Sequence, residues 1–172
     1  DWSWSRGLGD VYKRQLCYTS GTTGNPKGVL YSHRSTVLHA LIQCFYNVGS
    51  FSPKKKILPI VPLFHANAWG IPYSAPISGT SLVFPGANLD GKSVYDLLEK
   101  YSVNSAWGVP TVWMGLLEEI SHRRGKKPDG LEEMLVGGSA AAKSLIEDFE
   151  NMGVRVIHAW GMTETSPLGT SG

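Results

Sequence analysis

A loop rich in glycine and hydroxyl-bearing residues carries the strongest chemical signal in the sequence. Its glycines allow backbone N–H groups to approach phosphate oxygens closely, and its hydroxyl groups add hydrogen-bond donors. Lys27 supplies a compact positive charge suited to phosphate. The run is Thr19, Ser20, Gly21, Thr22, Thr23, Gly24, Asn25, Pro26, Lys27 and Gly28. The sequence therefore predicts a phosphate-binding loop, against the alternative of an ordinary surface loop.

This loop differs from the Walker A pattern of P-loop nucleotide hydrolases. That pattern places a glycine before its lysine and a serine or threonine after it. Pro26 and Gly28 occupy those two positions here. The sequence therefore disfavours a P-loop hydrolase.

A second polar turn, Trp160-Gly161-Met162-Thr163-Glu164, follows a predicted strand over 154–159. The Glu164 carboxylate can hold a hard cation such as Mg²⁺, which commonly bridges nucleotide phosphates. The Thr163 hydroxyl can donate to a phosphate. Taken by itself, a lone glutamate in a loop is more often simply solvated.

Two further loops follow predicted strands, at the sheet edge where α/β proteins bind their ligands. His65 lies in the segment 62–70, and on its own it is better explained as a loop or core histidine. The other loop comes after a predicted strand over 131–136, and a tight strand-to-helix turn is compatible with a binding role for it. Its residues are Gly137, Gly138, Ser139 and Ala140.

The phosphate loop and the turn at 160–164 together resemble two motifs of the adenylate-forming superfamily. This superfamily includes acyl-CoA synthetases, luciferases and peptide-synthetase adenylation domains. The resemblance covers residues 16–172. It implies part of a large N-terminal α/β domain, with mostly parallel sheets and flanking helices, which a small mobile C-terminal domain follows in family members.

The resemblance also implies a role for each motif. The loop from Thr19 to Lys27 would hold the β- and γ-phosphates of ATP, Thr163 would contact the AMP phosphate, and Glu164 would bind Mg²⁺. The adenine and acyl pocket would be bordered by Trp160, Gly161, Met162, Gly137, Gly138, Ser139 and Ala140. His65 would gate the acyl and pantetheine tunnel. Lys27, His65, Thr163 and Glu164 are the implied catalytic set.

The amino-acid sequences of segments 64–70 and 158–164 are most similar to those of fatty-acyl-CoA ligases, including the branch that acts on medium-chain and methylthiopropionate acids. The implied reaction uses ATP, Mg²⁺ and CoA. A carboxylate attacks the α-phosphorus of ATP to give acyl-AMP and pyrophosphate, and the CoA thiol then displaces AMP. Two alternatives stay open: an adenylation domain that loads a carrier-protein thiol, and a non-catalytic nucleotide-binding module.

Hydrophobic periodicity predicts strands and helices that alternate around these loops. The predicted strands cover 16–19, 57–61, 81–84, 103–107, 131–136 and 154–159. The predicted helices cover 33–46, 94–101, a segment that begins at Pro110, and a segment that contains 145–149. Pro59 predicts that the 57–61 strand is an edge or irregular strand. The alternation favours an α/β fold with a mostly parallel sheet.

The two ends of the sequence differ in character from its interior. The run from Ser5 to Gln15 matches the in-frame translation of the transposase adapter used to build short-read sequencing libraries. We therefore expect residues 1–15 to be a library scar, which the source DNA would reveal. Residues 16–172 then form an incomplete AMP-binding domain, with the C-terminal domain beyond Gly172. We expect this fragment to bind ATP weakly and to turn over nothing.

Composition excludes several classes of protein. The chain has 172 residues, of which 42% are apolar and 17% charged, with a net charge of +2. It is too apolar for a disordered chain, and no apolar run approaches the ~20 residues of a membrane helix. A peripheral membrane contact stays open. The small charge gives no argument for nucleic acid, so the expected partners are a small carboxylic acid, ATP and CoA. Cys17 and Cys44 form no disulfide framework, which favours a reduced, cytoplasmic setting. The oligomeric state is not predicted.

Overall fold

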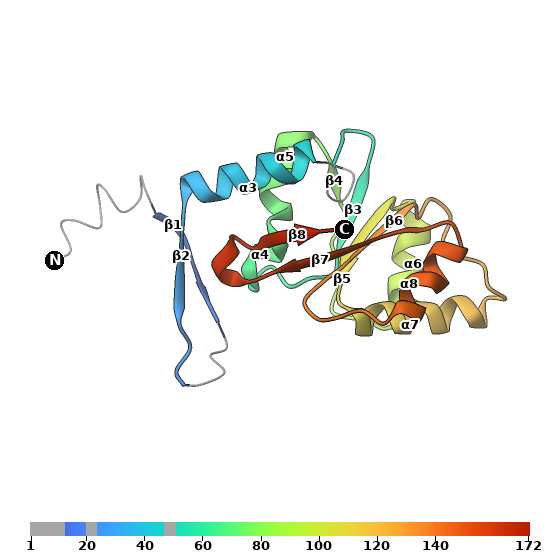
Figure 1. Cartoon of the computed structure of the whole chain (residues 1–172). Helices are drawn as coiled ribbons and strands as arrows, with labels where there is room; N and C mark the ends of the chain where they lie inside the picture. The colour runs from blue at the N-terminus through green and yellow to red at the C-terminus, as the bar shows by residue number, and fades with distance from the viewer. Residues whose placement is uncertain (1–12, 20–23, 47–50) are drawn as a thin grey trace.

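The computed structural model describes residues 13–19, 24–46 and 51–172. Its main element is a six-stranded sheet in the order β4-β3-β5-β6-β7-β8 (Figure 1). These strands are β3 (Lys56–Pro59), β4 (Ser81–Leu82), β5 (Ser105–Gly108), β6 (Glu133–Val136), β7 (Arg155–Gly161) and β8 (Leu168–Ser171). All neighbouring strands run parallel apart from β7 and β8. The structure thus confirms the predicted α/β fold.

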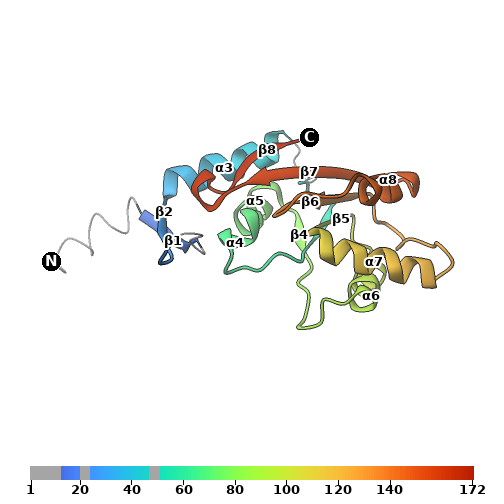
Figure 2. The same cartoon turned by 60° about the horizontal axis from the view of Figure 1, so that its bottom comes forward.

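Helices cover both faces of the sheet (Figure 2). One face packs against α6 (Gly91–Tyr101), α7 (Pro110–His122) and α8 (Lys143–Asn151), and the other against α4 (Ala66–Trp69) and α5 (Ile71–Ser78). Ala106 and Met134 belong to the first core, whereas their neighbours Trp107 and Leu135 belong to the second. Side chains of a strand alternate between faces, so these short apolar strands supply both cores. None of the helices in the described parts of the chain is long and apolar enough to cross a bilayer.

Pro59 is accommodated inside the sheet, so of the two predicted alternatives, an edge strand or an irregular strand, the edge strand is wrong. β3 lies between β4 and β5, and Pro59 is its last residue. β4 pairs only with Lys56 and Ile57. The absent N–H of Pro59 therefore falls where β4 has already ended, and Ile60 then donates its own N–H to the Trp107 carbonyl at 2.9 Å.

Helix α3 (His33–Phe45) confirms the predicted helix but exposes its apolar face. It begins at the cap Ser32, whose Oγ accepts from the Ser35 N–H at 3.0 Å. On the apolar face Val37, Leu38, Ile42 and Phe45 are about half exposed or more. The helix buries Thr36, His39, Ala40 and Gln43 instead, and it packs against α5. Polar side chains of α3 are thereby turned toward the interior.

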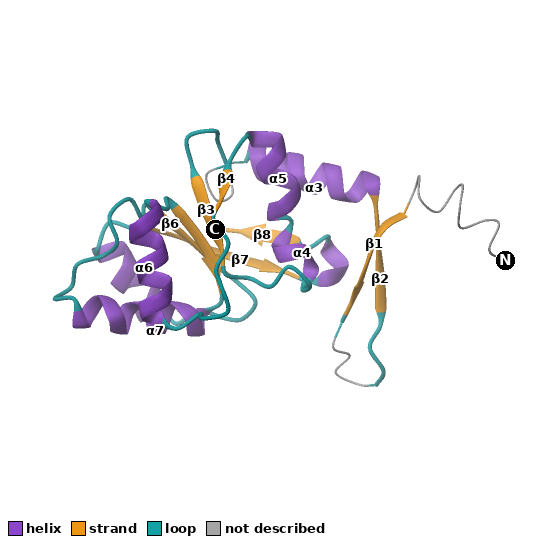
Figure 3. Cartoon of the chain, turned by 180° about the vertical axis from the view of Figure 1, so that it is seen from behind, coloured by secondary structure: helices purple, strands orange, loops and turns teal. Residues whose placement is uncertain are grey.

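The antiparallel hairpin of β1 (Lys13–Tyr18) and β2 (Gly28–Ser32) stands apart from the six-stranded sheet (Figure 3). The sequence predicts only a strand over 16–19 and misses β2. β1 begins inside the segment expected to be a scar, and residues 1–12 of that segment lie outside the described residues.

Helix α4 is a left-handed turn rather than an ordinary helix. Ala66, Asn67, Ala68 and Trp69 have φ angles of 45°, 54°, 46° and 57°. This conformation costs an L-residue roughly 1–2 kcal/mol, so no helix propensity predicts it. The turn ends at Gly70 with φ of 85°, where an added Cβ would lie 2.6 Å from Cε1 of His39. Glycine is required here both by the φ angle and by the close approach of the imidazole.

Candidate functional site

A cavity of about 210 Å³ lies at the carboxyl ends of β5, β6 and β7. The buried part of its wall is largely apolar, with Trp107, Leu135 and Ala159 and with Trp69 beside them, and Gln43 adds one buried amide. The exposed part of its wall carries more polar groups, from His65, Gly138 and the residues that end β7. An apolar interior with a few polar groups at its opening is typical of a small-molecule site.

The structure brings together most of the residues predicted for an adenine and acyl pocket. The cavity is lined by His65, Gly137, Gly138, Trp160, Gly161, Met162 and Thr163. Ser139 and Ala140 follow in the loop toward α8, where they are exposed and do not line the cavity. Glu164 is exposed and lies beside Thr163 in the short 3-10 turn η2 (Thr163–Thr165).

The predicted phosphate loop is described only at its two ends. Ser20, Gly21, Thr22 and Thr23 lie outside the described residues. The Thr19 N–H donates to the Lys27 carbonyl at 2.9 Å, which closes the base of the loop. Gly24 and Lys27 are exposed, and neither lines the cavity.

The turn that joins β7 to β8 is held by its own backbone and by two outside side chains. Within the turn, the Met162 N–H donates to the Pro167 carbonyl at 3.0 Å. From outside, the Tyr31 hydroxyl donates to the Thr163 carbonyl at 2.5 Å. The Leu168 N–H donates to Nε2 of His39 at 3.1 Å. Thr163 and Glu164 are therefore carried on a turn with defined anchors in β2 and α3.

Burial sets the protonation of both outside anchors. It lowers the pKa of His39 to about 4, so the imidazole is neutral at neutral pH and its Nε2 can accept a hydrogen bond. Burial also raises the pKa of Tyr31, and its electrostatic interactions with Cys17 and Glu164 add to this effect. The Tyr31 hydroxyl therefore keeps its proton and acts as a donor.

The Trp69 indole packs against the backbone of Gly137 and Gly138, the two glycines that follow β6. A Cβ added to Gly137 would lie 3.2 Å from Cη2 of Trp69. The Trp69 carbonyl accepts from Nε2 of Gln43 at 2.8 Å, and Oε1 of Gln43 in turn accepts from Oγ of Ser74 at 2.5 Å. Gly137 thus leaves room for the indole, and a fully buried amide fixes the strained turn that carries it.

Several lining residues were missed by sequence reasoning, namely Gln43, Trp69, Trp107 and Leu135. One signal was present: Thr36, His39 and Gln43 recur at helical spacing, so they share a face of α3. The apolar face of the same helix gave the stronger periodic pattern, and that pattern predicted burial of the face that is in fact exposed.

The two charged side chains predicted for the nucleotide site, Glu164 and Lys27, fit a nucleotide with its metal ion. The Glu164 carboxylate is exposed, and within the described residues neither it nor Lys27 takes part in an ion pair. In the same parts of the chain there is no cluster of three metal-binding side chains. A single carboxylate suits Mg²⁺, which is usually held by one or two carboxylates together with substrate phosphates.

Comparison with known proteins gives matches over nearly the whole chain. The chain is 55% identical over 157 residues to a medium-chain-fatty-acid–CoA ligase of Ectopseudomonas oleovorans. It is 50% identical over 157 residues to a 3-methylmercaptopropionyl-CoA ligase of Ruegeria lacuscaerulensis. Each alignment covers 91% of this chain and 29% of the relative.

A solved structure and a family profile agree with these relatives. The o-succinylbenzoate coenzyme A synthetase of Bacillus subtilis, in complex with ATP and a magnesium ion, matches with a TM-score of 0.79 at 29% identity. The match covers 91% of this chain and 32% of that one. The profile of the AMP-binding enzyme family matches residues 14–171. The predicted superfamily is thus confirmed, and the chain belongs to the AMP-binding enzyme family.

Proposed function

We propose that this chain is the nucleotide- and acyl-binding part of an ATP-dependent acyl-CoA ligase for a fatty or similar carboxylic acid. One observation carries the proposal: an apolar cavity opens beside the Thr163–Glu164 turn, at the carboxyl ends of parallel strands. Such a site can bury an acyl chain and keep the charged end of an adenylate near solvent. The fatty-acid and thioether-acid ligases among the relatives support this assignment.

In this proposal the cavity holds the acyl-adenylate. Trp69, Trp107 and Leu135 contact the acyl chain, because they form much of the apolar wall. The adenine lies along the exposed side, against the backbone of Gly137, Gly138 and 160–162. His65, exposed at the opening, contacts the acid and the CoA thiol arm as they enter.

The phosphates are bound by charged and hydroxyl groups. The Thr163 hydroxyl donates to the α-phosphate, while Lys27 and the loop from Thr19 to Gly24 hold the β- and γ-phosphates. Glu164 holds Mg²⁺, which when bound neutralises charge on the phosphates. The phosphate gains charge as pyrophosphate leaves, and these residues hold hydrogen-bond donors fixed around it. Stabilisation of that charge is the main catalytic effect that we assign to them.

The carboxylate of the acid attacks the α-phosphorus, the bond to pyrophosphate breaks, and the thiolate of CoA then displaces AMP from the acyl-AMP. We place this reaction in the cytoplasm, in keeping with Cys17 and Cys44, both free thiols.

Nuclear magnetic resonance titration of the ¹⁵N-labelled chain tests the proposal. Adding ATP with Mg²⁺ should shift the backbone amides of Gly137, Gly161 and Thr163. Adding octanoate should shift the indole N–H signals of Trp69 and Trp107, which line the cavity. Trp113 is the matched control, because it is fully buried in the other core. Shifts confined to exposed apolar residues, or none with ATP, would contradict the proposal.

A further inference from the structure

Two side chains far away in the sequence hold the turn that carries Thr163 and Glu164. Tyr31 reaches the Thr163 carbonyl across 132 positions of the chain, and His39 reaches the Leu168 N–H across 129. Figure 2 shows this red turn close to α3 and to the end of β2. The segment is therefore anchored at each end by a different element, β2 at Thr163 and α3 at Leu168.

Of the two hydrogen bonds that the Thr163 carbonyl accepts within the described residues, the one from the Tyr31 hydroxyl is the shorter. The tyrosine is only 4% exposed, whereas its neighbour Leu30 is 49% exposed, so the alternation of β2 directs Tyr31 inward. Within the described residues the same carbonyl also accepts from the Ser166 N–H, but at 3.5 Å. That separation is long for a hydrogen bond. Losing the Tyr31 hydroxyl would leave the carbonyl with this weak partner.

We propose that Tyr31 is a positioning residue for the nucleotide, which fixes the Thr163 peptide and thereby sets where the Thr163 hydroxyl and the Glu164 carboxylate point. The inference rests on the proposed function. Thr163 and Glu164 are consecutive in η2, so rotation of the peptide between them moves both groups. Small displacements of binding groups are costly because a phosphate needs its donors at hydrogen-bond distance.

The position of Tyr31 in β2 also links the two halves of the nucleotide site. β2 begins at Gly28, directly after Lys27, and its other end carries Tyr31. One short strand therefore connects the loop assigned to the β- and γ-phosphates with the turn assigned to the α-phosphate. The Tyr31 hydrogen bond fixes the spacing between these two groups of ligands.

The test compares two single-hydroxyl deletions, Tyr31→Phe and Tyr95→Phe. Tyr95 is a matched control because it is 2% exposed and its hydroxyl also donates to a backbone carbonyl, that of Lys126 at 3.1 Å. It lies in α6, in the core on the other face of the sheet. Each variant of the ¹⁵N-labelled chain is titrated with AMP, and amide hydrogen exchange is measured without ligand.

Tyr31→Phe should weaken AMP binding about tenfold, which corresponds to one hydrogen bond, and should speed exchange at the amides of 162–166. Tyr95→Phe should change neither. Wild-type AMP affinity in Tyr31→Phe would overturn the role of Tyr31, even if exchange in the turn were faster. No AMP binding by the wild-type chain would instead overturn the proposed function, and with it this inference.

A second readout covers the case in which Tyr31→Phe does not fold. Tyr31 does not line the cavity. Bound AMP can therefore change the signals of Tyr31 only through the turn to which its hydroxyl is hydrogen-bonded. In the wild-type chain AMP should therefore shift the ring signals of Tyr31 together with the Thr163 amide, and leave those of Tyr95 in place. An unshifted Tyr31 ring would overturn the proposal.

Discussion

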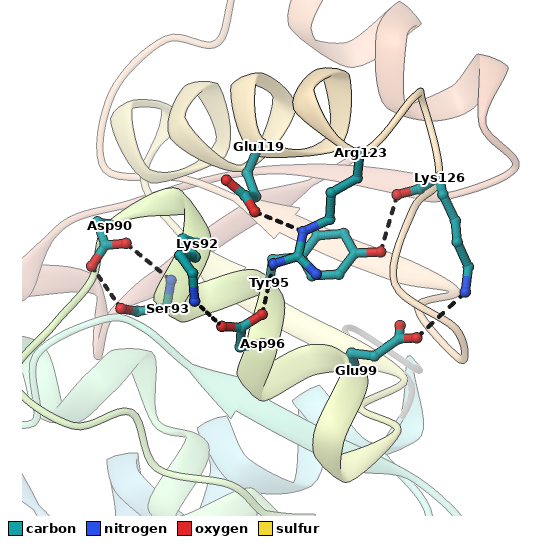
Figure 4. A network of polar contacts seen from close by, with 9 residues as sticks. All are labelled: Asp90, Lys92, Ser93, Tyr95, Asp96, Glu99, Glu119, Arg123 and Lys126. Carbon is teal, nitrogen blue, oxygen red and sulfur yellow. Dashed lines mark hydrogen bonds and ion pairs between the residues drawn. The ribbon is translucent and has the colours of Figure 1, made fainter.

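Charged residues are used in opposite ways in two regions of the molecule, the α6–α7 pair and the segments assigned to the phosphates. Between α6 and α7, Asp96 binds Lys92 at 2.7 Å and Arg123 at 2.8 Å, and Arg123 also binds Glu119 at 2.6 Å (Figure 4). The Arg123 guanidinium lies 3.9 Å from the ring centroid of Tyr95. In the loop and the turn assigned to the phosphates, Lys27 and Glu164 take part in no ion pair within the described residues. Charged side chains that form ion pairs with one another contribute to the stability of the fold. Charged side chains without an ion-pair partner are available to bind a ligand.

Uncharged polar groups show the reverse distribution. Around the cavity they are buried and bound to backbone, as Gln43 is to the Trp69 carbonyl and His39 to the Leu168 N–H. Between α6 and α7 the charged groups form a network that is partly exposed, with Asp96 47% and Glu119 17% exposed. Substitutions of buried polar groups at the site should therefore affect packing and position more than substitutions of the exposed charges between α6 and α7.

The largest expected effect is that of Gly70→Ala, since the new methyl group would collide with His39 and the residue would keep a positive φ. We expect a loss of roughly 3 kcal/mol in the free energy of unfolding. The control is Gly125→Ala, at φ of 77° beyond α7 with no atom within 4 Å of the added Cβ, which should cost about 1 kcal/mol. Urea denaturation measures both, and equal losses would contradict the difference between the two regions.

The second prediction separates the two regions by pH. The pKa of buried His39 is about 4 in the folded chain, against 6.5 for a free histidine. As the pH falls below 6.5 the unfolded chain binds this proton first, so stability is full above that pH. It should fall by roughly 3 kcal/mol on the way to pH 4.

The Asp96 carboxylate titrates in a lower window, because hydrogen bonding to Lys92 lowers its pKa below the usual 3.8. Its contribution to stability is present above that value and is lost only at lower pH. Urea denaturation from neutral pH down to pH 4 should therefore show the loss in the wild-type chain and much less of it in His39→Gln. An identical pH slope in His39→Gln would refute this assignment.

The third prediction concerns ligand binding. Glu164→Gln should weaken binding of ATP in the presence of Mg²⁺ about tenfold and leave AMP binding without Mg²⁺ unchanged. Asp96→Asn is the control, since its carboxylate already serves Lys92 and Arg123. Isothermal titration calorimetry measures both variants. Equal effects of the two substitutions on ATP binding would remove the distinction between paired and unpaired charges.

The smallest expected effect is that of Asp96→Asn on stability. Its side chain is 47% exposed, so the ion pairs with Lys92 and Arg123 are screened by solvent. We expect a loss of less than about 1 kcal/mol, which added salt should reduce further. A loss of several kcal/mol in urea denaturation would mean that this network contributes more than its exposure implies.

Much of the fold could be predicted because local pattern and tertiary structure agree there. The helix that begins at Pro110 is an example: proline suits the first turn, and Trp113, Leu116 and Ile120 are buried at the spacing of one helical face. The edge position predicted for the Pro59 strand is wrong because the place of a proline in a sheet depends on where a neighbouring strand ends, which is a property of β4 and not of β3.

The motifs of the site could be predicted from the sequence, but the hydrogen bonds that hold those motifs in place could not. Gly137, Trp160 and Thr163 were found from short strings and do line one cavity. Tyr31 and His39 were missed because their contacts cross more than a hundred positions and leave no local trace. The left-handed turn at 66–69 was missed because it opposes the preference of Ala66, Ala68 and Trp69.

Pyrophosphate release by a chimaera tests the central claim most directly. In it, residues 16–172 replace the matching segment of the Ectopseudomonas oleovorans ligase, to which the chain is 55% identical, and the same chimaera with Glu164→Gln is the control. The account predicts release of pyrophosphate from ATP that depends on a carboxylic acid and falls in the control. A folded chimaera that releases no pyrophosphate with any acid would contradict it.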